Sequence, residues 1–571
     1  MLMAVLRPPP ATASARDRTH RLVIDTVLLG LAGAAAALLF NVVLRWCQQL
    51  FLHRIAGYLP PGLAGEAGSA VEVIGTHGLW LIPIATMLGG LIVGLLTTWI
   101  APEAEGHGTD TVVHSFHRRG GLLRPRLAPL KLLTSAITIG SGGSAGREGP
   151  IAMIASALGS WYAQVTKRTE SERRLLLLVG AAAGIATIFR SPIGAALFAV
   201  EVLYADMEFE ASVLLYATIG AIVAYAVAGQ LTEYGALFVV PQPIAPLPRP
   251  IDYAWYAVLG VAAGLIALVL PVIFYRTRDL FRALPVQAAL KPAIGGLLAG
   301  LIALRLPQLL GGGYGWMQRA IDGRLALGLL VTLAFGKIVA LSFTVGSGGS
   351  GGVFAPSLYI GAMLGGALAS AANLPAAPFV VVGMAAVFAG AAHVPFATMM
   401  MVVEMTGGYS LLAPAALAVT LSYLVQTRLS RRLRHRSIYE AQVHSRGESP
   451  AHHTAHLKIA LRILREKQLP NLDHLGEVDL VALLRSGLPV EIGDDQRIVV
   501  RRLRASSALA NTDIRTNGGR LRGAEVNIIG ILRGEHMLAP RPDLVLEGGD
   551  RLILVAPASG LQALRDDLEP W

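Results

Sequence analysis

One glycine-rich stretch occurs twice in this chain of 571 residues, and it constrains the fold more than any other feature. Residues 140–159 read GSGGSAGREGPIAMIASALG, and residues 346–365, 206 positions later, read GSGGSGGVFAPSLYIGAMLG. The likeness continues downstream, where SPIGAALFAVE ends at Glu201 and VPFATMMMVVE ends at Glu404. The sequence therefore predicts two related halves, each with a glycine-rich break, a helix that starts after the break, and an apolar helix that ends in a carboxylate.

The composition places both halves in a membrane. Hydrophobic residues make up 54% of the chain and charged residues only 15%, and the mean hydropathy is +0.56. These values are far from those of a soluble globular domain. Apolar stretches long enough to cross a bilayer recur between residues 22 and 430. We therefore expect a multi-pass protein of the cell membrane, surrounded by lipid.

The positive charge of the chain is explained by its membrane spans rather than by binding to nucleic acid. The formal net charge is +11, and basic residues gather before the first apolar stretch (Arg16, Arg18, Arg21) and after the last one (RLSRRLRHR, 428–436). Because cytoplasmic flanks of membrane spans are rich in Lys and Arg, we expect both termini in the cytoplasm and no nucleic-acid partner. Cys47 is the only cysteine, which excludes an intramolecular disulfide and a cysteine-based metal site. We expect no metal and no cofactor.

Changes in composition divide the chain into four parts. The predicted parts are a cytoplasmic N-terminal tail at 1–20, a membrane domain at 21–440, a linker with a helical segment at 441–487, and a small α/β domain at 488–571. A proline-rich connector separates the repeat halves, which span about 21–230 and 252–440. The β-rich runs RIVVRRL, VNIIGILR and RLILVAP predict strands of the last domain. The linker histidines His452, His453 and His456 indicate either a metal site or, as we favour, a solvated helix face.

The glycine-rich breaks carry the first chemical signal. A helix that starts after such a break presents unpaired N–H groups and about half a positive charge at its N-terminus, and this arrangement binds anions without a full cation. Glycines let the backbone approach an ion closely, and Pro150 and Pro356 suit a first helical turn. The simpler alternative is that the glycines serve only close helix packing. This alternative is less favoured because the glycine-rich motif occurs twice with the same downstream pattern. A phosphate-binding loop is excluded because its lysine and Ser/Thr are absent.

Glu148 opens the first of these helices. A carboxylate in a membrane segment costs roughly 2.5–3.5 kcal/mol at mid-bilayer, so its presence indicates a function. Where an anion should bind, the carboxylate can compete with the anion when charged and leave when protonated, which makes Glu148 a candidate titratable gate. The alternative is a structural ion pair with Arg147, which is disfavoured because adjacent residues on a helix point in different directions.

The motifs GREGP at 146–150, GVFAP at 352–356, the GSGG runs and SPIGAALFAVE together resemble the CLC family of chloride channels and chloride/proton antiporters. The resemblance covers about residues 20–440 and implies an all-α polytopic CLC fold of two inverted repeats of broken helices. It also implies a homodimer with one pore per subunit that transports chloride or a similar monovalent anion. Residues 488–566 resemble the RCK/TrkA C-terminal domain, which implies dimerisation with either a small-molecule ligand or a purely structural role.

By this resemblance Glu148 is the gating glutamate, and the implied anion-binding residues are His107, Gly108, Arg147, Gly149, Val353, Phe354, Ala355 and Tyr439. Two of the aligned positions depart from the family pattern, since His107 and Asp110 stand where the family has serine and proline. His107 either donates a ring N–H to the anion, more strongly below about pH 6.5, or leaves the coordination to backbone N–H groups. Asp110 is expected to cap its own helix.

The proton pathway departs from the family pattern as well. Its candidates are Glu148 and Glu201, while Val202 occupies the position of the internal glutamate that relays protons in family antiporters. Because valine carries no proton, we expect a passive chloride channel gated by protonation of Glu148, and no enzyme activity. A chloride/proton antiporter is the alternative. A cation-linked carrier of organic solutes and a non-conducting membrane receptor are minor alternatives.

Overall fold

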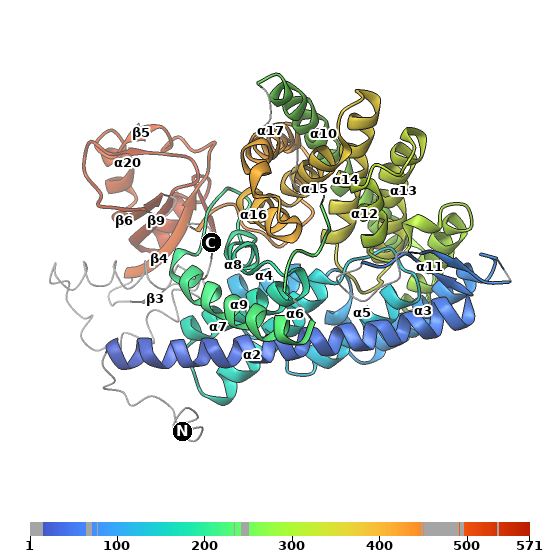
Figure 1. Ribbon diagram of the computed structural model, residues 1–571. Helices are drawn as coiled ribbons and strands as arrows, with labels where there is room; N and C mark the ends of the chain where they lie inside the picture. Colours follow the sequence, from blue (N-terminus) through green and yellow to red (C-terminus); the bar gives the residue numbers. More distant parts are fainter. Residues whose placement is uncertain are drawn as a thin grey trace. The chain divides into compact units, whose positions relative to one another are not determined.

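The computed structural model describes residues 15–63, 71–76, 78–232, 234–240, 250–446, 449, 451, 490–491, 496–533 and 536–570 (Figure 1). The chain divides into two compact units, residues 1–442 and 443–571. The linker histidines His452, His453 and His456 lie outside the described residues.

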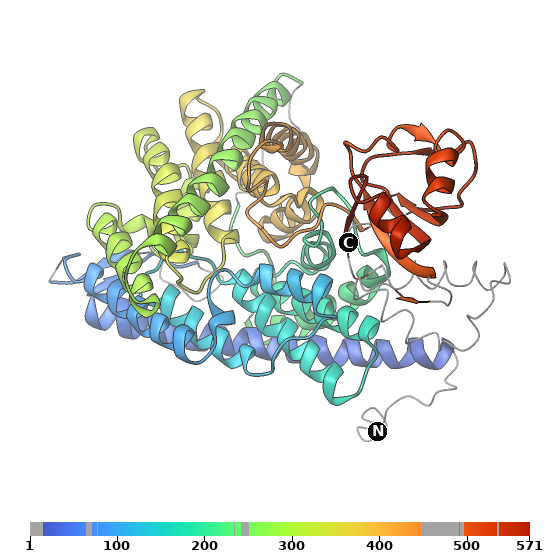
Figure 2. The same cartoon turned by 180° about the vertical axis from the view of Figure 1, so that it is seen from behind.

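The first unit is built of helices that occur twice in the same order (Figures 1 and 2). The first series is α2 (Ala15–Gln48), α3 (Ile82–Trp99), α4 (Thr109–Arg118), α5 (Leu127–Gly140), α6 (Glu148–Val165), α7 (Glu170–Phe189), α8 (Pro192–Glu201) and α9 (Ala211–Thr232). The second series is α10 (Asp252–Ala283), α11 (Lys291–Ala303), α12 (Tyr314–Ile321), α13 (Leu327–Gly346), α14 (Phe354–Ala371), α15 (Ala376–Ala392), α16 (Pro395–Thr406) and α17 (Leu412–Ser430). The repeat seen in the sequence therefore extends to whole helices.

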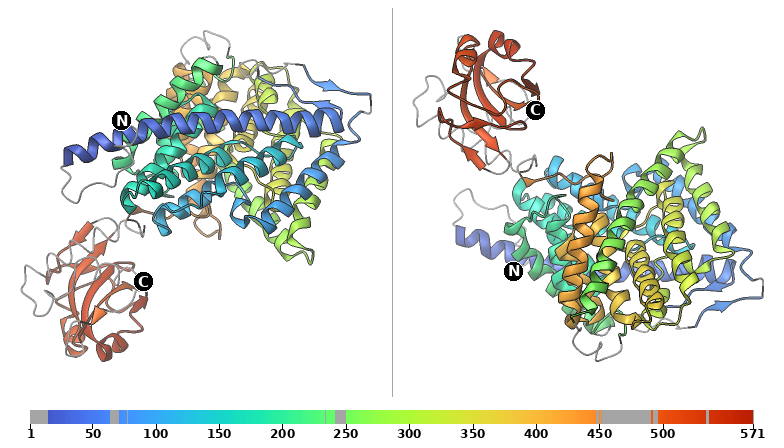
Figure 3. Two further views of the ribbon diagram at one scale, coloured as in Figure 1. Left: turned by 90° about the horizontal axis from the view of Figure 1, so that it is seen from below. Right: turned by 90° about the horizontal axis from the view of Figure 1, so that it is seen from above.

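Helix lengths agree with the prediction of broken helices in a membrane. Within the described residues, seven helical segments are long and apolar enough to cross a bilayer, while α5, α8 and α15 are apolar but shorter. The long helix α2 runs along one side of this unit (Figure 3). It begins at Ala15, so residues 15–20 of the predicted N-terminal tail are helical.

Equivalent glycines set the packing in both halves. A Cβ atom on Gly159 would lie 2.2 Å from the carbonyl oxygen of Leu176, and one on Gly365 would lie 2.0 Å from that of Phe379. Side chains at these two positions would therefore push α6 away from α7 and α14 away from α15. The close backbone contact explains why glycine stands at the same place in both copies.

The second unit contains an antiparallel six-stranded sheet in the order β10-β4-β9-β6-β7, with β3 also paired to β4. The strands are β3 (Val490–Glu491), β4 (Gln496–Leu503), β6 (Asn527–Arg533), β7 (His536–Leu538), β9 (Arg551–Pro557) and β10 (Leu568–Pro570). The three predicted β-rich runs correspond to β4, β6 and β9. Short helices α20 (Gly518–Gly523) and α21 (Ala558–Ala563) complete the α/β unit, whose core includes Val499, Leu552 and Leu554.

Candidate functional site

The two glycine-rich loops meet directly. The Gly146 N–H donates to the Gly352 carbonyl oxygen at 2.7 Å, and the Gly352 N–H donates to the Gly146 carbonyl oxygen at 2.6 Å. These glycines are equivalent in the repeat, so the reciprocal pair joins the start of α6 to the start of α14. A Cβ atom on Gly149 would lie 2.0 Å from the His107 carbonyl oxygen, so the start of α4 also approaches α6 closely. The N-termini of three broken helices thus converge.

The Glu148 side chain is buried at this convergence. Its Oε2 atom accepts a hydrogen bond at 3.4 Å from the Ala355 N–H, in the first turn of α14, and its Oε1 atom accepts one from the Tyr314 hydroxyl. The carboxylate therefore occupies the N-terminus of α14, where an anion would bind. Arg147, the neighbouring residue, has other contacts: its Nη1 donates to Asn41 at 3.3 Å, and its guanidinium lies 4.9 Å from the centre of the Tyr314 ring.

His107, Asp110 and Tyr439 gather at the start of α4. The His107 Nε2 atom lies 3.1 Å from Asp110 Oδ2, and its Nδ1 atom is buried with no hydrogen-bond partner among the described residues. The Tyr439 ring is buried, with its centroid 5.4 Å from that of the His107 ring. These groups line the approach to Gly108, the N-cap residue of α4.

The prediction that Asp110 caps its own helix is wrong. The N-cap position of α4 is taken by Gly108 with φ 87°, and no side chain caps this helix. Asp110 instead accepts hydrogen bonds from the N–H groups of Glu440 at 3.3 Å and Ala441 at 3.1 Å. It therefore ties the segment that carries Tyr439 to the start of α4.

Phe354 lies in an aromatic cluster. Its ring centroid is 4.3 Å from that of Phe388 and 4.8 Å from that of Phe189. The Phe198 centroid is 6.1 Å from that of Phe354, and Phe198 and Phe388 both lie 6.4 Å from the Tyr439 ring. Val353 is the N-cap residue of α14. The cluster fixes the direction of α14, so the N–H groups at its start point at Glu148.

Glu201 and Glu404 cap each other's helices. The Glu201 carboxylate accepts hydrogen bonds from the N–H groups of Phe396 at 3.1 Å and Ala397 at 2.6 Å, at the start of α16. The Glu404 carboxylate accepts from the N–H groups of Ile193 at 3.3 Å and Gly194 at 2.8 Å, at the start of α8, and also from the Ser191 hydroxyl. The two helices therefore run antiparallel, with a carboxylate at each end of the pair.

Val202 is buried next to Glu201, and its carbonyl oxygen accepts a hydrogen bond from Gln442 Nε2 at 3.1 Å. Its side chain has no group that can carry a proton. Both oxygens of Glu201 are engaged by the backbone of α16. These contacts give Glu201 a structural role at the interface of the two repeats.

Sequence reasoning missed a pair of fully buried lysines. Lys131 Nζ donates to the carbonyl oxygens of Ala104 at 2.9 Å and Gly106 at 2.6 Å, and Lys337 Nζ donates to those of Leu309 at 2.8 Å and Gly311 at 2.6 Å. Each lysine holds the loop that leads into α4 or α12. The signal was present in the sequence, because both lysines stand nine residues before a GSGG run.

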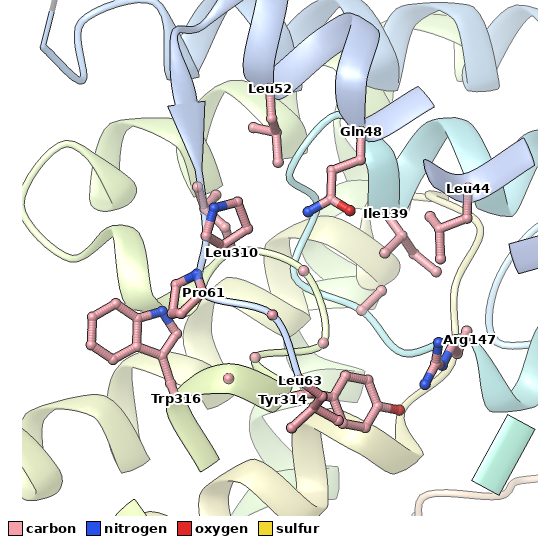
Figure 4. Close-up of a pocket in the computed structure, with 17 residues that line it drawn as sticks. Leu44, Gln48, Leu52, Pro61, Leu63, Ile139, Arg147, Leu310, Tyr314 and Trp316 are labelled. Atoms are coloured by element: carbon pink, nitrogen blue, oxygen red, sulfur yellow. The ribbon is translucent and has the colours of Figure 1, made fainter. Parts of the chain in front are cut away.

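A cavity of about 130 Å³ is lined by residues at the start of α12 and by Arg147, which directly precedes Glu148 in the chain (Figure 4). Its polar lining includes Gln48, Arg147, Tyr314 and the glycine loop 311–313. Figure 4 shows the hydroxyl end of Tyr314 directed to the side of the cavity where Arg147 lies. Tyr314 was also missed by sequence reasoning, since no pattern distinguishes a tyrosine that contacts Glu148 from one in the core.

Known proteins show similarity to both units. The family described as voltage gated chloride channel matches residues 89–427, and the TrkA-C domain matches residues 498–569. A putative chloride channel protein ClcB-like from Ralstonia nicotianae (strain ATCC BAA-1114 / GMI1000) is 29% identical over 409 residues, covering 70% of this chain and 91% of that protein. The H(+)/Cl(-) exchange transporter ClcA from Salmonella arizonae (strain ATCC BAA-731 / CDC346-86 / RSK2980) is 30% identical over 412 residues, covering 68% and 80%.

Solved structures share the fold. A slow cyanobacterial Cl−/H+ antiporter has a TM-score of 0.62 at 22% identity and covers 73% of this chain and 95% of its own. A CLC-type fluoride/proton antiporter has a TM-score of 0.63 at 22% identity and covers 76% and 100%. The predicted fold class and the TrkA-type C-terminal domain are thereby confirmed. Because the family match spans more than half of its residues, the chain belongs to the voltage-gated chloride channel (CLC) family and carries a TrkA-C domain after the membrane domain.

Proposed function

We propose that this protein exchanges chloride for protons across the membrane, with Glu148 as the gate and as a proton carrier. The observation that carries the proposal is the Glu148 carboxylate at the N-terminus of α14, in the place of an anion. Relatives named H(+)/Cl(-) exchange transporters support exchange. They favour the antiporter alternative over the passive channel that we expected from Val202.

The geometry suggests how one side chain could couple two ions. An ionised Glu148 blocks the helix N-termini because its own charge takes the N–H groups that an anion needs. Once protonated, the neutral carboxyl binds these N–H groups less strongly, and an anion can replace it. Return of the side chain then requires both loss of the anion and loss of the proton, which links the two movements.

His107 is a further polar group beside the proposed anion path. Its Nε2 atom faces the Asp110 carboxylate, an acceptor, so we assign the ring hydrogen to this nitrogen. The buried Nδ1 atom is then a lone pair, which repels an anion.

Reconstituted vesicles test the proposal. Purified protein in vesicles with a chloride gradient should move protons against their gradient, recorded with chloride and pH electrodes together. A Glu148→Gln variant should pass chloride without moving protons and without pH dependence. Chloride flux with no proton movement in the unmodified protein would show a passive channel, and the absence of any flux would favour a non-conducting receptor.

We further propose a homodimer with one pathway per subunit, with both termini in the cytoplasm and the TrkA-C domain binding a small ligand or clamping the dimer. The family relationship and the TrkA-C match support these points. Light scattering of the detergent-solubilised protein tests the dimer, and a monomer mass would contradict it. Protease protection in sealed vesicles tests the placement of the termini.

A further inference from the structure

Tyr314 stands at a place that the repeat does not explain. It is the first residue of α12, the counterpart of α4 in the second half, and the equivalent position in the first half is Thr109. Its hydroxyl donates a hydrogen bond to Glu148 Oε1. The same side chain lines the cavity at the start of α12 (Figure 4).

The Tyr314 ring is held from several directions. The Arg147 guanidinium lies 4.9 Å from the ring centre, and the Phe238 ring centroid lies 6.2 Å from it. The preceding loop is fixed by Lys337 through the carbonyl oxygens of Leu309 and Gly311. Because these contacts restrict movement of the Tyr314 ring, its hydroxyl can bind the Glu148 carboxylate in one position only.

We propose that Tyr314 is a positioning residue of the gate: its hydroxyl holds the Glu148 carboxylate at the α14 N-terminus, and its ring separates that carboxylate from the cavity. This inference rests on the proposed exchange function. Movement of Glu148 toward the cavity then requires this hydrogen bond to break. Tyr314 thereby slows the exchange and sets the pH at which the gate opens.

Other charged and titratable groups also act on Glu148. They are Arg147 on its own helix, Lys337 on α13, and Tyr439 after the last membrane helix. A Tyr314→Phe substitution leaves all of them in place and removes a single oxygen atom. Any change in pH dependence of this variant therefore reports on the hydroxyl itself.

The test measures chloride turnover in vesicles between pH 4.5 and 8 for the unmodified protein and for Tyr314→Phe. A hydrogen bond to a charged group corresponds to roughly a 10- to 100-fold change in an equilibrium. We expect turnover near neutral pH to rise about tenfold, with the half-maximal pH moved upward by about one unit. In a Glu148→Ala background, where no carboxylate remains to be held, the same substitution should leave chloride turnover unchanged across this pH range.

A matched control removes the same kind of bond elsewhere. The Tyr162 hydroxyl donates to Asp25 Oδ1 at 2.6 Å near the opposite end of α6 from Glu148, and Tyr162→Phe should keep the pH profile of the unmodified protein. A second variant should change turnover and the half-maximal pH in the opposite direction. Difluorotyrosine at position 314 is a stronger hydrogen-bond donor, so it should slow turnover and lower the half-maximal pH.

The outcomes separate this inference from the proposed function. If the unmodified protein and Glu148→Ala both carry no anion, the exchange function itself is refuted. If both behave as proposed while Tyr314→Phe and the difluorotyrosine variant keep the original profile, only the role of Tyr314 is refuted. An equal shift in the Glu148→Ala background would also refute it, because the hydroxyl would then act without the carboxylate.

Discussion

The reciprocal capping of α8 and α16 gives a decisive test of the proton pathway. Glu201 was a candidate relay by sequence, whereas in the structure it caps α16 just as Glu404 caps α8. Changing each to glutamine, separately, keeps the shape of the side chain and removes its charge. If both carboxylates are caps, both variants should be less stable, and both should still exchange chloride for protons.

The contacts set the size of the effect. In Glu201→Gln one oxygen remains to accept the Ala397 N–H, while the new NH₂ group faces the Phe396 N–H, a donor against a donor. The Phe396 N–H is then a buried donor without an acceptor, which costs about 1–3 kcal/mol. Easier burial of the neutral amide offsets part of this cost. We therefore expect a loss of about 2 kcal/mol for Glu201→Gln, and a similar or smaller loss for Glu404→Gln, whose side chain is less buried.

Two measurements decide whether Glu201 is a helix cap or a proton relay. Thermal unfolding in detergent, followed by size-exclusion chromatography, gives the change in stability, and parallel chloride and pH recording in vesicles gives the number of protons moved per chloride. Capping predicts lower thermal midpoints and an unchanged ratio for both variants. The reasoning fails if Glu201→Gln keeps its thermal midpoint but moves no protons while Glu404→Gln still moves them.

Three further perturbations follow from the structure. His107→Ser should shift the chloride-to-nitrate permeability ratio; an unaltered ratio would leave the coordination to backbone N–H groups. Lys337→Met leaves two buried carbonyl oxygens without their donor, so the thermal midpoint should fall, by an equivalent of at least about 2 kcal/mol; an unchanged midpoint would show that water replaces the ammonium. In the TrkA-C domain, Arg533 donates two hydrogen bonds to the Asp550 carboxylate, and this contact raises the pKa of Arg533. Arg533→Ala removes these bonds, so proteolysis of this domain in the full chain should become faster while chloride flux continues. Equal proteolysis rates would contradict this.

The sequence was sufficient to predict the repeated helices of the membrane domain. The GSGG runs and the two terminal carboxylates located the starts of α6 and α14 and the ends of the helix pair, because glycine breaks and helix N-termini have local signals. The β-rich runs likewise located β4, β6 and β9. Partners far apart in the chain were beyond such reasoning. Nothing local indicates that Glu201 contacts α16, 195 residues away.

The same limit explains the errors at the site. Asp110 has the residue type of a helix cap and the right place for one, but tertiary contacts with the N–H groups of Glu440 and Ala441 compete for its carboxylate. The role of Tyr314 depends on a hydrogen bond that spans 166 residues. Both cases involve short polar contacts between the two halves, where the fold rather than local propensity chooses the partner.

Some buried polar groups of the two halves match each other, whereas the groups at the starts of α6 and α14 do not. Lys131 and Lys337, and Glu201 and Glu404, occupy equivalent places and stabilise both halves alike. The groups nearest the helix starts do not match in this way, because Glu148 stands opposite Phe354 in the repeat. The carboxylate on α6 has no counterpart on α14, so only one half supplies a titratable side chain at the helix starts. Under the proposed exchange function, this asymmetry gives the two ends of the pathway different responses to protons.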